Sequence, residues 1–253
     1  MRALLFDNTK CIGCGSCMMA CREENGLPET SAPDLTDRQF TVLKTAPGKG
    51  GDVSYRRMCM HCEDPTCASV CPVGALHKTA AGPVVYNADI CLGCRYCIQA
   101  CPFGVPRYEW SSLAPRVRKC TFCSGRLAAG KVNACAEACP TGATIAGERE
   151  ALLKDARSRL AAEPDKYVQK IYGEHDAGGT SVLMLSSVPF SQLGLPDNLP
   201  AEPLPLLTFR MLSKIPTLAG AGSCMLAGLW WFTNRKAEVA RVEGGRAKTG
   251  GRQ

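Results

Sequence analysis

The arrangement of the cysteines constrains this chain more than any other feature of its sequence. Sixteen of the 17 cysteines fall into four groups of four. The first and third groups share the spacing C-x2-C-x2-C-x3-C, the second has C-x2-C-x4-C-x3-C, and the fourth has C-x2-C-x11-C-x3-C. In chain order the groups are Cys11, Cys14, Cys17 and Cys21; Cys59, Cys62, Cys67 and Cys71; Cys91, Cys94, Cys97 and Cys101; and Cys120, Cys123, Cys135 and Cys139. Repetition of one pattern indicates a duplicated metal-binding unit.

The spacing within each group suits an iron–sulfur cubane. Three closely spaced cysteines can curl round one cluster, while a fourth cysteine three residues later is directed at a neighbouring cluster. Proline follows the last cysteine of three groups, at Pro72, Pro102 and Pro140, where its fixed φ and missing N–H suit the start of a helix. Arg22 stands there in the first group, which we interpret as a local difference in geometry and not as loss of a site.

Three other uses of cysteine were weighed. Structural zinc favours two C-x2-C pairs separated by a longer span, and disulfides need a bridging geometry that thiols three residues apart cannot all reach. A Rieske-type centre needs two histidines, whereas His61 stands inside a complete cysteine group and is expected either to donate a hydrogen bond near a cluster or to be exposed. Sixteen ligands therefore predict four [4Fe–4S] clusters, and Cys224 remains as a small apolar packing residue.

At this point the motifs resemble a known family. The segments CIGCGSCMMAC, CPVGAL, CLGCRYCIQACPFGVPRY, KCTFC and ACPTGA resemble the four-cluster iron–sulfur subunits of dimethyl-sulfoxide reductase, formate dehydrogenase-N and membrane-bound uptake hydrogenases. The resemblance covers roughly residues 3–200, and the stretch 172–196 is most similar to the formate dehydrogenase and hydrogenase members. The nitrate reductase branch has a tryptophan in place of one cysteine of the third group, which is complete here.

The resemblance implies how the ligands are shared. Two ferredoxin-like dicluster halves would interleave in an α+β fold, the first formed by residues 1–50 and 103–188 and the second by residues 51–102. The implied ligand sets are set A (Cys11, Cys14, Cys17, Cys139), set B (Cys21, Cys120, Cys123, Cys135), set C (Cys59, Cys62, Cys67, Cys101) and set D (Cys71, Cys91, Cys94, Cys97). Such sharing would couple cluster assembly to folding.

Local patterns add a few elements. Alternation predicts short strands at 39–44, 53–55, 82–86 and 181–186, and composition predicts a helix over 148–162 that stops before Pro164. Residues 189–214, with five prolines between 189 and 205, are expected to form a linker.

The 18 residues from Ile215 to Phe232 contain no charged side chain and as a helix would reach about 27 Å, close to the thickness of a hydrocarbon core. A buried core helix is the alternative. Glycines at 220, 222 and 228, a Trp230-Trp231 pair and the following Arg235-Lys236 favour a single C-terminal transmembrane helix.

The net charge of +7 is concentrated at the end of the chain. Residues 206–253 carry eight basic and two acidic side chains, so the remainder is nearly neutral and nucleic acid is not an expected partner. Residues 233–253 are expected to be a basic, disordered tail. The positive-inside tendency places this tail in the cytoplasm and the cluster domain in the periplasm. Only ten residues precede Cys11, too few for an apolar signal segment, so we expect a partner to carry any export signal, as the resemblance implies.

Taken together, the sequence predicts an electron-transfer subunit that is not an enzyme on its own. Electrons would pass through the four clusters between a catalytic subunit of the molybdenum or tungsten formate dehydrogenase type and an integral membrane partner with a cytochrome b or quinone site. A nickel–iron uptake hydrogenase or a sulfur or sulfoxide reductase could be served by the same relay. A redox-sensing metalloprotein is the third hypothesis, although a sensor needs neither four clusters nor an anchor in the lipid bilayer.

Overall fold

The first strand of the chain lies at the centre of a sheet whose other strands come much later in the sequence. In the computed structural model, which describes residues 1–48 and 50–249 and only the backbone of 244–249, β1 (Arg2–Asp7) lies between β8 (Thr144–Glu148) and β9 (Val182–Leu185). It pairs antiparallel with β8 and parallel with β9. The start of the chain is thereby held against segments that follow the fourth cysteine group.

β1 is buried on both faces because it is a central strand. Successive side chains of a strand point to opposite faces, and here Ala3 and Leu5 pack with residues of α6 (Arg149–Ala162), while Leu4 and Phe6 join the core that contains many of the cysteines. A continuous apolar run is what such a strand requires.

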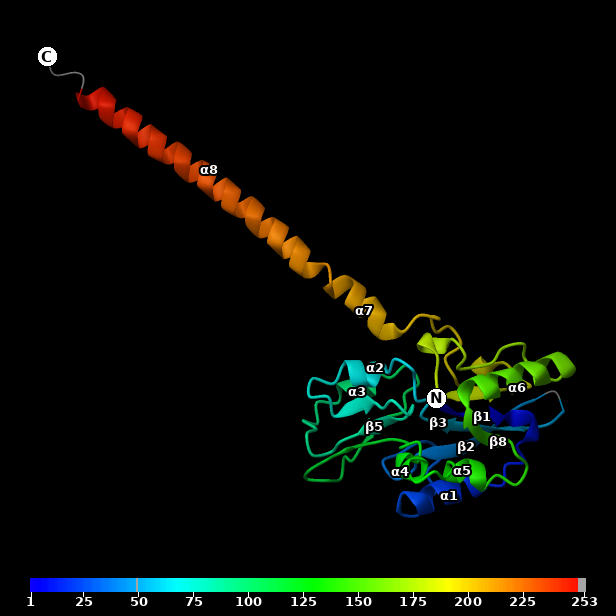
Figure 1. Ribbon diagram of the computed structural model, residues 1–253. Coiled ribbons are helices and arrows are strands. Elements are labelled where there is room, and N and C mark those ends of the chain that lie inside the picture. Colours follow the sequence, from blue (N-terminus) through cyan, green and yellow to red (C-terminus); the bar gives the residue numbers. More distant parts are fainter. Residues whose placement is uncertain (49, 250–253) are drawn as a thin grey trace. The chain divides into compact units, whose positions relative to one another are not determined.

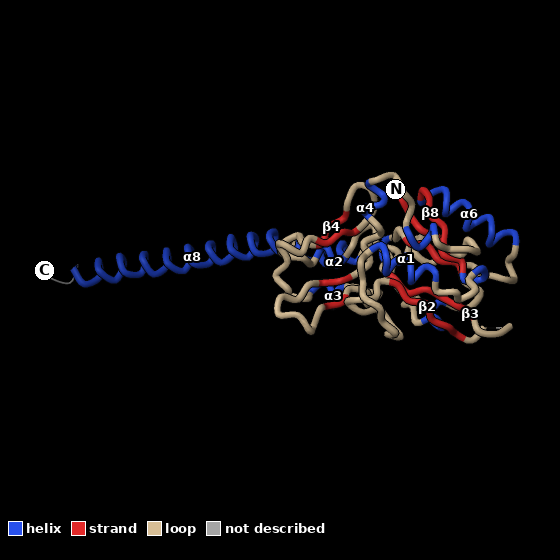
Figure 2. The backbone as a smooth tube through the Cα atoms, turned by 90° about the horizontal axis from the view of Figure 1, so that it is seen from below, coloured by secondary structure: helices blue, strands red, loops and turns tan. Residues whose placement is uncertain are grey.

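Around this sheet the cysteine-bearing segments are short helices and two-stranded hairpins. Figure 1 shows α2, α3 and β5 together on one side of residues 1–205, and α1, α4, α5, β2 and β8 together on the other. The tube in Figure 2 shows how much of this unit is loop. The antiparallel hairpins are β2 (Thr41–Ala46) with β3 (Val53–Met58), β4 (Leu76–Lys78) with β5 (Val84–Tyr86), and β6 (Arg107–Tyr108) with β7 (Val117–Arg118). The helices are α1 (Ser16–Glu24), α2 (Thr66–Ser69), α3 (Tyr96–Ala100), α4 (Ser124–Ala128) and α5 (Ala134–Glu137), with 3-10 turns η1 (Asn8–Lys10), η2 (Asp176–Gly178) and η3 (Phe190–Leu193).

The predicted mixture of helix and strand is confirmed, and the four predicted strands and the helix before Pro164 are present. A hairpin crosses one predicted boundary. β3 pairs with β2 from Val53 to Met58, so hydrogen bonds tie residues 53–58, which follow the boundary predicted at residue 51, to the strand that precedes them.

The predicted linker over 189–214 also differs from the structure. Its first part is packed, with Phe190, Leu193 and Leu195 buried in the main core. The chain divides into two units only at Pro205, the second unit being residues 206–253. Apolar side chains between the prolines therefore attach most of this segment to the cluster-binding unit.

Two helices, α7 (Leu204–Leu212) and α8 (Ile215–Thr249), make up nearly all of the second unit. α8 includes the predicted span 215–232 but continues through residues 233–249, where a disordered tail was predicted; residues 250–253 lie outside the described part. Ala, Glu, Arg and Lys predominate after Phe232, and such residues extend an existing helix at little cost. The segment Leu204–Glu243 is long and apolar enough to cross a membrane by length and composition, and none of its most apolar window is buried.

The turn after Tyr172 provides a test of the packing. Gly173 has φ of +90°, and a Cβ there would lie 2.3 Å from Thr180 Oγ1 and 2.5 Å from Val182 O. We expect Gly173→Ala to lower the free energy of unfolding by about 3 kcal/mol, since backbone strain and a clash add. Gly194→Ala is the matched control, because its φ is +64° and nothing lies within 4 Å, and it should cost about 1 kcal/mol. Thermal unfolding followed by circular dichroism measures both, and equal losses would contradict the clash.

Candidate metal centres

All four cysteine groups begin with the same backbone turn. The residue two positions after the first cysteine has a left-handed conformation in every group, namely Gly13, His61, Gly93 and Phe122. This turn directs the backbone N–H of that residue back to the first sulfur: Gly93 N lies 3.4 Å from Cys91 Sγ, and Phe122 N lies 3.3 Å from Cys120 Sγ. The turn supplies the N–H donors that a cluster-binding thiolate requires.

The last cysteine of three groups is followed by a second shared turn. A glycine with positive φ stands three residues after it, at Gly74, Gly104 and Gly142. The backbone then donates to sulfur, with Ala75 N 3.2 Å from Cys71 Sγ and Thr144 N 3.3 Å from Cys139 Sγ.

These donors change the acidity of the thiols. Burial by itself would raise the pKa of Cys71 and Cys139, but the backbone N–H groups outweigh it and lower the pKa of both. The lowered pKa favours the thiolate, which is the form that binds a metal.

The first group departs from this arrangement where Arg22 replaces proline. Without a proline to stop it, α1 runs on past Cys21 to Glu24. Cys21 is buried inside the helix, and its neighbour is the Asn25 side chain, with Nδ2 3.7 Å from Cys21 Sγ. Burial, with nearby thiolates, raises the pKa of Cys21 to about 12. The difference is one of local geometry.

Strand pairing brings cysteines from distant groups together. β1 ends four residues before Cys11 and β8 begins five residues after Cys139, and the two strands pair antiparallel, with Asp7 N 2.8 Å from Ala143 O. The hairpin of β4 and β5 likewise returns the chain from Cys71 to the third group. These strand pairs thus bring Cys139 toward the first group and Cys71 toward the third group.

Electrostatic interactions among the thiolates identify the nearest neighbours. Burial is the largest cause that raises the pKa of Cys11, Cys62 and Cys97, and neighbouring thiolates raise it further. The interacting neighbours are Cys14 and Cys139 for Cys11; Cys17, Cys123 and Cys135 for Cys21; Cys59, Cys67 and Cys101 for Cys62; and Cys71, Cys91 and Cys94 for Cys97.

Further interactions connect these neighbourhoods in one order. Cys17 and Cys135 interact, as do Cys120 and Cys59, and Cys67 and Cys97. The thiolates therefore form a continuous series from Cys11 in the first group to Cys94 in the third.

The spacing of the donors distinguishes a cluster from a single ion. Four thiolates on one zinc ion at about 2.3 Å would lie within about 4 Å of one another. Among the described residues no three Cys, His, Asp or Glu side chains converge closely enough to hold one metal ion. A cubane places its four irons at separate corners and holds its thiolates farther apart than a single ion does.

Three cations, two of them buried and one partly buried, lie among the cysteines, and sequence reasoning missed all three. Arg56 is 1% exposed, Lys119 is buried and Lys78 is partly buried. Both lysines donate to backbone carbonyls beside ligand cysteines, Lys78 Nζ to Cys62 O at 2.7 Å and Lys119 Nζ to Cys120 O at 3.0 Å. The only signal was a basic residue next to a motif, and nothing in the sequence shows that it is buried.

His61 is fully buried, so the expectation that it might be exposed is wrong. Its Nδ1 accepts a hydrogen bond from Val84 N at 3.1 Å, and its ring lies 4.6 Å from the ring of Phe122. Burial, with Lys119 and Lys78 nearby, lowers the pKa of His61. The ring is therefore neutral and carries its hydrogen on Nε2, which has no hydrogen-bond partner among the described residues.

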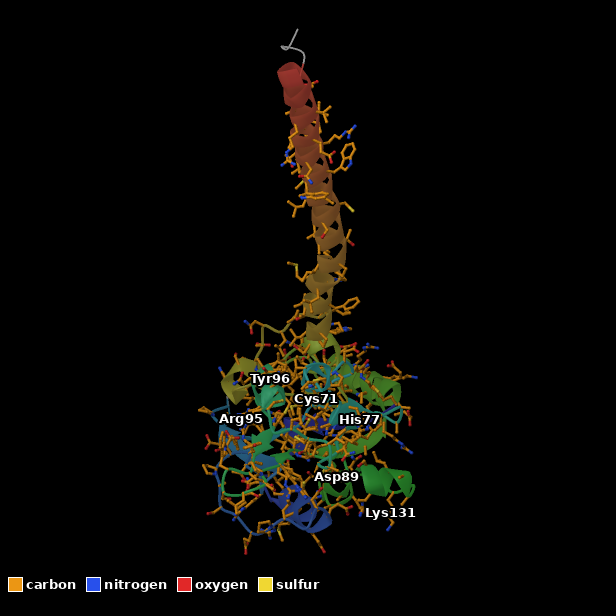
Figure 3. The ribbon with its side chains drawn as sticks, turned by 90° about the vertical axis from the view of Figure 1, so that its left-hand side faces the viewer. Cys71, His77, Asp89, Arg95, Tyr96 and Lys131 are labelled. Carbon is orange, nitrogen blue, oxygen red and sulfur yellow. The ribbon has the colours of Figure 1, made fainter. Side chains whose placement is uncertain are left out.

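The series of cysteines is exposed at its two ends and buried in the middle. Cys14 and Cys94 are exposed, whereas Cys21, Cys59, Cys120 and Cys135 are buried. Ile12 and Leu92, which precede the exposed turns, are 68% and 70% exposed. Figure 3 places Arg95 and Tyr96, next to Cys94, at the outside of this unit.

Comparison with known proteins identifies the domains. Residues 53–149 and residues 10–75 each match a family described as "4Fe-4S dicluster domain". The chain is 38% identical to a protein of Nitratidesulfovibrio vulgaris strain Hildenborough, over 95% of this chain and 69% of that protein. It is 35% identical to the hydrogenase-2 operon protein HybA of Escherichia coli O157:H7, over 76% of this chain and 72% of HybA. It is 34% identical to the formate dehydrogenase-O iron-sulfur subunit of Escherichia coli K12, over 78% of this chain and 71% of that subunit.

Two exposed cysteines test whether group membership or exposure governs metal binding. Cys14 and Cys224 are both exposed, but only Cys14 belongs to a cysteine group. We expect Cys224→Ser to leave the iron content unchanged and Cys14→Ser to reduce it, because a lost ligand weakens one cluster. Iron and acid-labile sulfide per purified chain measure the effect, and a loss of iron in Cys224→Ser would contradict this assignment.

Proposed function

Because the chain belongs to the family of iron–sulfur electron-transfer subunits of multi-subunit oxidoreductases, we propose that it relays electrons through four [4Fe–4S] clusters between a catalytic subunit and a membrane partner. The observation that carries the proposal is the continuous series of thiolates, buried in the middle and exposed at both ends. A chain that only sensed redox state would need no such path with two exits.

We assign the ligands to sets A to D as named above. The interacting thiolate neighbours support this assignment, since Cys139 interacts with Cys11 and Cys71 interacts with Cys97. The pairing of β1 with β8 and of β4 with β5 supports it independently, because each brings the last cysteine of one group to the start of another.

When bound, the clusters supply one-electron redox chemistry. The chain's own residues hold and insulate them. Backbone N–H groups at Gly93, Phe122, Ala75 and Thr144 donate to ligand sulfurs, and such bonds adjust the reduction potential. Phe122 and neutral His61 fill the space beside Cys120 and Cys59 and exclude water where sets B and C meet.

Electrons enter and leave at the two ends of the series. Set A is reached at the turn of Cys14, and set D at the turn of Cys94. The exposed Ile12 and Leu92 give each turn an apolar rim that suits contact with a partner protein. Each end would receive a different partner.

We propose a formate dehydrogenase type of catalytic partner, with a nickel–iron hydrogenase as the second candidate. The formate dehydrogenase-O subunit and HybA are similar to this chain at nearly equal identity, 34% and 35%. The metal of the catalytic subunit separates the two candidates.

Metal analysis of the complex, captured from solubilised membranes through a tag on this chain, tests the relay. We expect about 16 irons per chain from four cubanes, with molybdenum or tungsten. Nickel without either metal would replace the formate dehydrogenase type by the hydrogenase type. Zinc in place of iron, or far fewer irons, would overturn the relay.

We further propose that α8 anchors the chain in a membrane, with its C-terminal end in the cytoplasm and the cluster unit on the other side. The apolar segment 215–232 is followed by Arg235 and Lys236, and basic side chains are more numerous after the segment than before it, which supports this orientation. The aligned Nitratidesulfovibrio protein covers 95% of the chain, so its similarity extends into residues 206–253.

Charge placed inside the span tests the anchor. Leu226→Arg puts a guanidinium near the centre of the apolar segment, which costs about 3 kcal/mol for insertion. Val242→Arg, at an exposed position on the same helix beyond the segment, is the matched control. Extraction of membranes at alkaline pH should release more of the Leu226→Arg chain and retain the control. Equal release of both would argue against a transmembrane α8.

A further inference from the structure

Arg56 is a buried charge that lacks an acidic partner. It is 1% exposed, and among the described residues no carboxylate lies within ion-pair distance of its guanidinium. Its assigned hydrogen bonds go to two hydroxyls, from Nε to Thr41 Oγ1 at 2.7 Å and from Nη1 to Thr144 Oγ1 at 3.3 Å. Since a buried arginine stays charged and a buried charge without a counter-charge is costly, its compensation must come from elsewhere.

The cysteines around Arg56 provide that compensation. Burial would lower the pKa of Arg56, but Cys135, Cys17 and Cys21 raise it. Thr144, which Arg56 holds through Oγ1, donates its own N–H to Cys139 Sγ at 3.3 Å. Cys17 and Cys139 belong to set A, and Cys21 and Cys135 belong to set B, so Arg56 lies between the two sets.

We propose that Arg56 is a fixed positive charge between sets A and B that raises the reduction potentials of both clusters. A reduced cluster carries one more negative charge than an oxidised one, and a nearby cation in a low-dielectric interior stabilises the reduced form. The inference rests on the proposed function, because it presupposes clusters held by sets A and B. Arg56 is a positioning residue: it acts on the clusters through its fixed positive charge and does not itself carry electrons.

The other buried cations are arranged differently. Lys78 Nζ donates to His61 O, Cys62 O and Ser181 Oγ, and Lys119 Nζ donates to Val84 O and Cys120 O. Backbone carbonyl oxygens thus compensate much of the positive charge of Lys78 and Lys119. Among the described residues the guanidinium of Arg56 donates to two hydroxyls and to no carbonyl, so its charge acts on the nearby cysteines.

Arg57 offers a matched control on the same strand. It is adjacent to Arg56, but its Nη1 lies 3.5 Å from Asp34 Oδ2 and its Nη2 donates to Phe103 O at 3.2 Å. Its charge is therefore paired with a carboxylate that is 39% exposed.

The test is a redox titration of the complex followed by electron paramagnetic resonance, with iron content measured on each sample. In Arg56→Met we expect two of the four one-electron steps to move to lower potential. At an ambient potential equal to the wild-type midpoint, their ratio of reduced to oxidised cluster should fall at least tenfold, which is 59 mV for a one-electron couple. Arg56→Lys should retain most of both midpoints, and Arg57→Met should leave these two steps unchanged.

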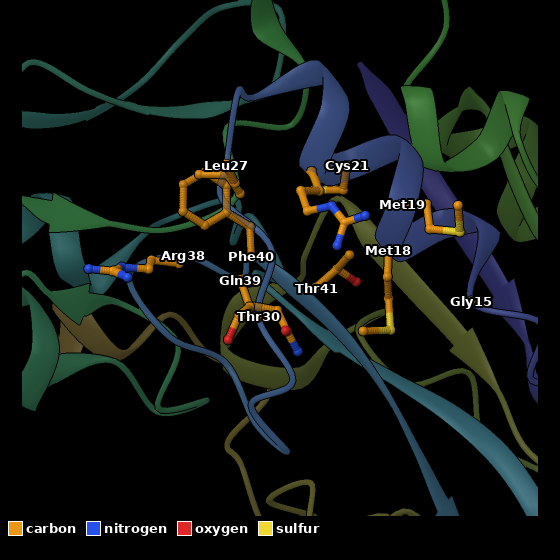
Figure 4. A pocket seen from close by; sticks show the side chains of 11 residues that line it. Gly15, Met18, Met19, Cys21, Leu27, Thr30, Arg38, Gln39, Phe40 and Thr41 are labelled. Carbon is orange, nitrogen blue, oxygen red and sulfur yellow. The ribbon is translucent and has the colours of Figure 1, made fainter.

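A second pair of variants keeps Arg56 in place. Thr41 lines the pocket beside α1 together with Cys21 (Figure 4), and its hydroxyl already accepts from Arg56. Thr41→Asp places a carboxylate against the guanidinium and should lower the same two potentials, whereas Thr41→Asn should not. The two Thr41 variants test the proposal if the Arg56→Met variant fails to assemble its clusters. Full iron content with unmoved potentials in Arg56→Met, or in Thr41→Asp, would overturn the proposal, while a wild-type complex without clusters would instead overturn the relay.

Discussion

The ligand assignment that we propose brings four thiolates to each cluster from segments far apart in the chain, and this requirement governs the rest of the structure. In that assignment no single cysteine group closes a site on its own, because its last member is turned away by three residues of chain. Backbone pairing supplies the missing member: β1 with β8 places Cys139 beside Cys11, and the β4–β5 hairpin places Cys71 beside the third group. The small amount of regular structure in the cluster unit serves this purpose.

An interior built round sulfur has unusual requirements. Thiolates and their clusters are anionic, and burial opposes any charge that is not compensated. In this chain, backbone N–H donors at repeated left-handed turns and buried cations compensate the negative charge. The N–H groups act on individual sulfurs, as at Cys71 and Cys139, whereas a charge such as Arg56 acts on several cysteines at once. The turns therefore compensate the charge of individual sulfurs, and buried cations compensate the charge of several cysteines together.

Particular residues show how far sequence reasoning reached. The motif prolines and Arg22 correctly marked where the turns repeat and where the first group differs. β1 was not predicted, because its continuous apolar run of four residues, Ala3 to Phe6, has no period to distinguish strand from helix. Residues 233–249 were expected to be disordered on composition, yet a helix that has already formed extends through such residues readily. The sequence shows that His61 stands inside a cysteine group. Its burial, however, depends on Val84 and Phe122, which are remote in sequence.

The sequence by itself determined the chemistry: the cysteine type, number and spacing specify iron–sulfur ligation, since covalent geometry limits which thiolates can share a turn. It also determined the apolar segment near the C-terminus, which depends only on consecutive residues. Tertiary structure decided which distant cysteines are neighbours and that Arg56 is buried near several of them. These depend on strand pairing across most of the chain, and pairing energy arises only when both partners are folded together, so no local pattern encodes it.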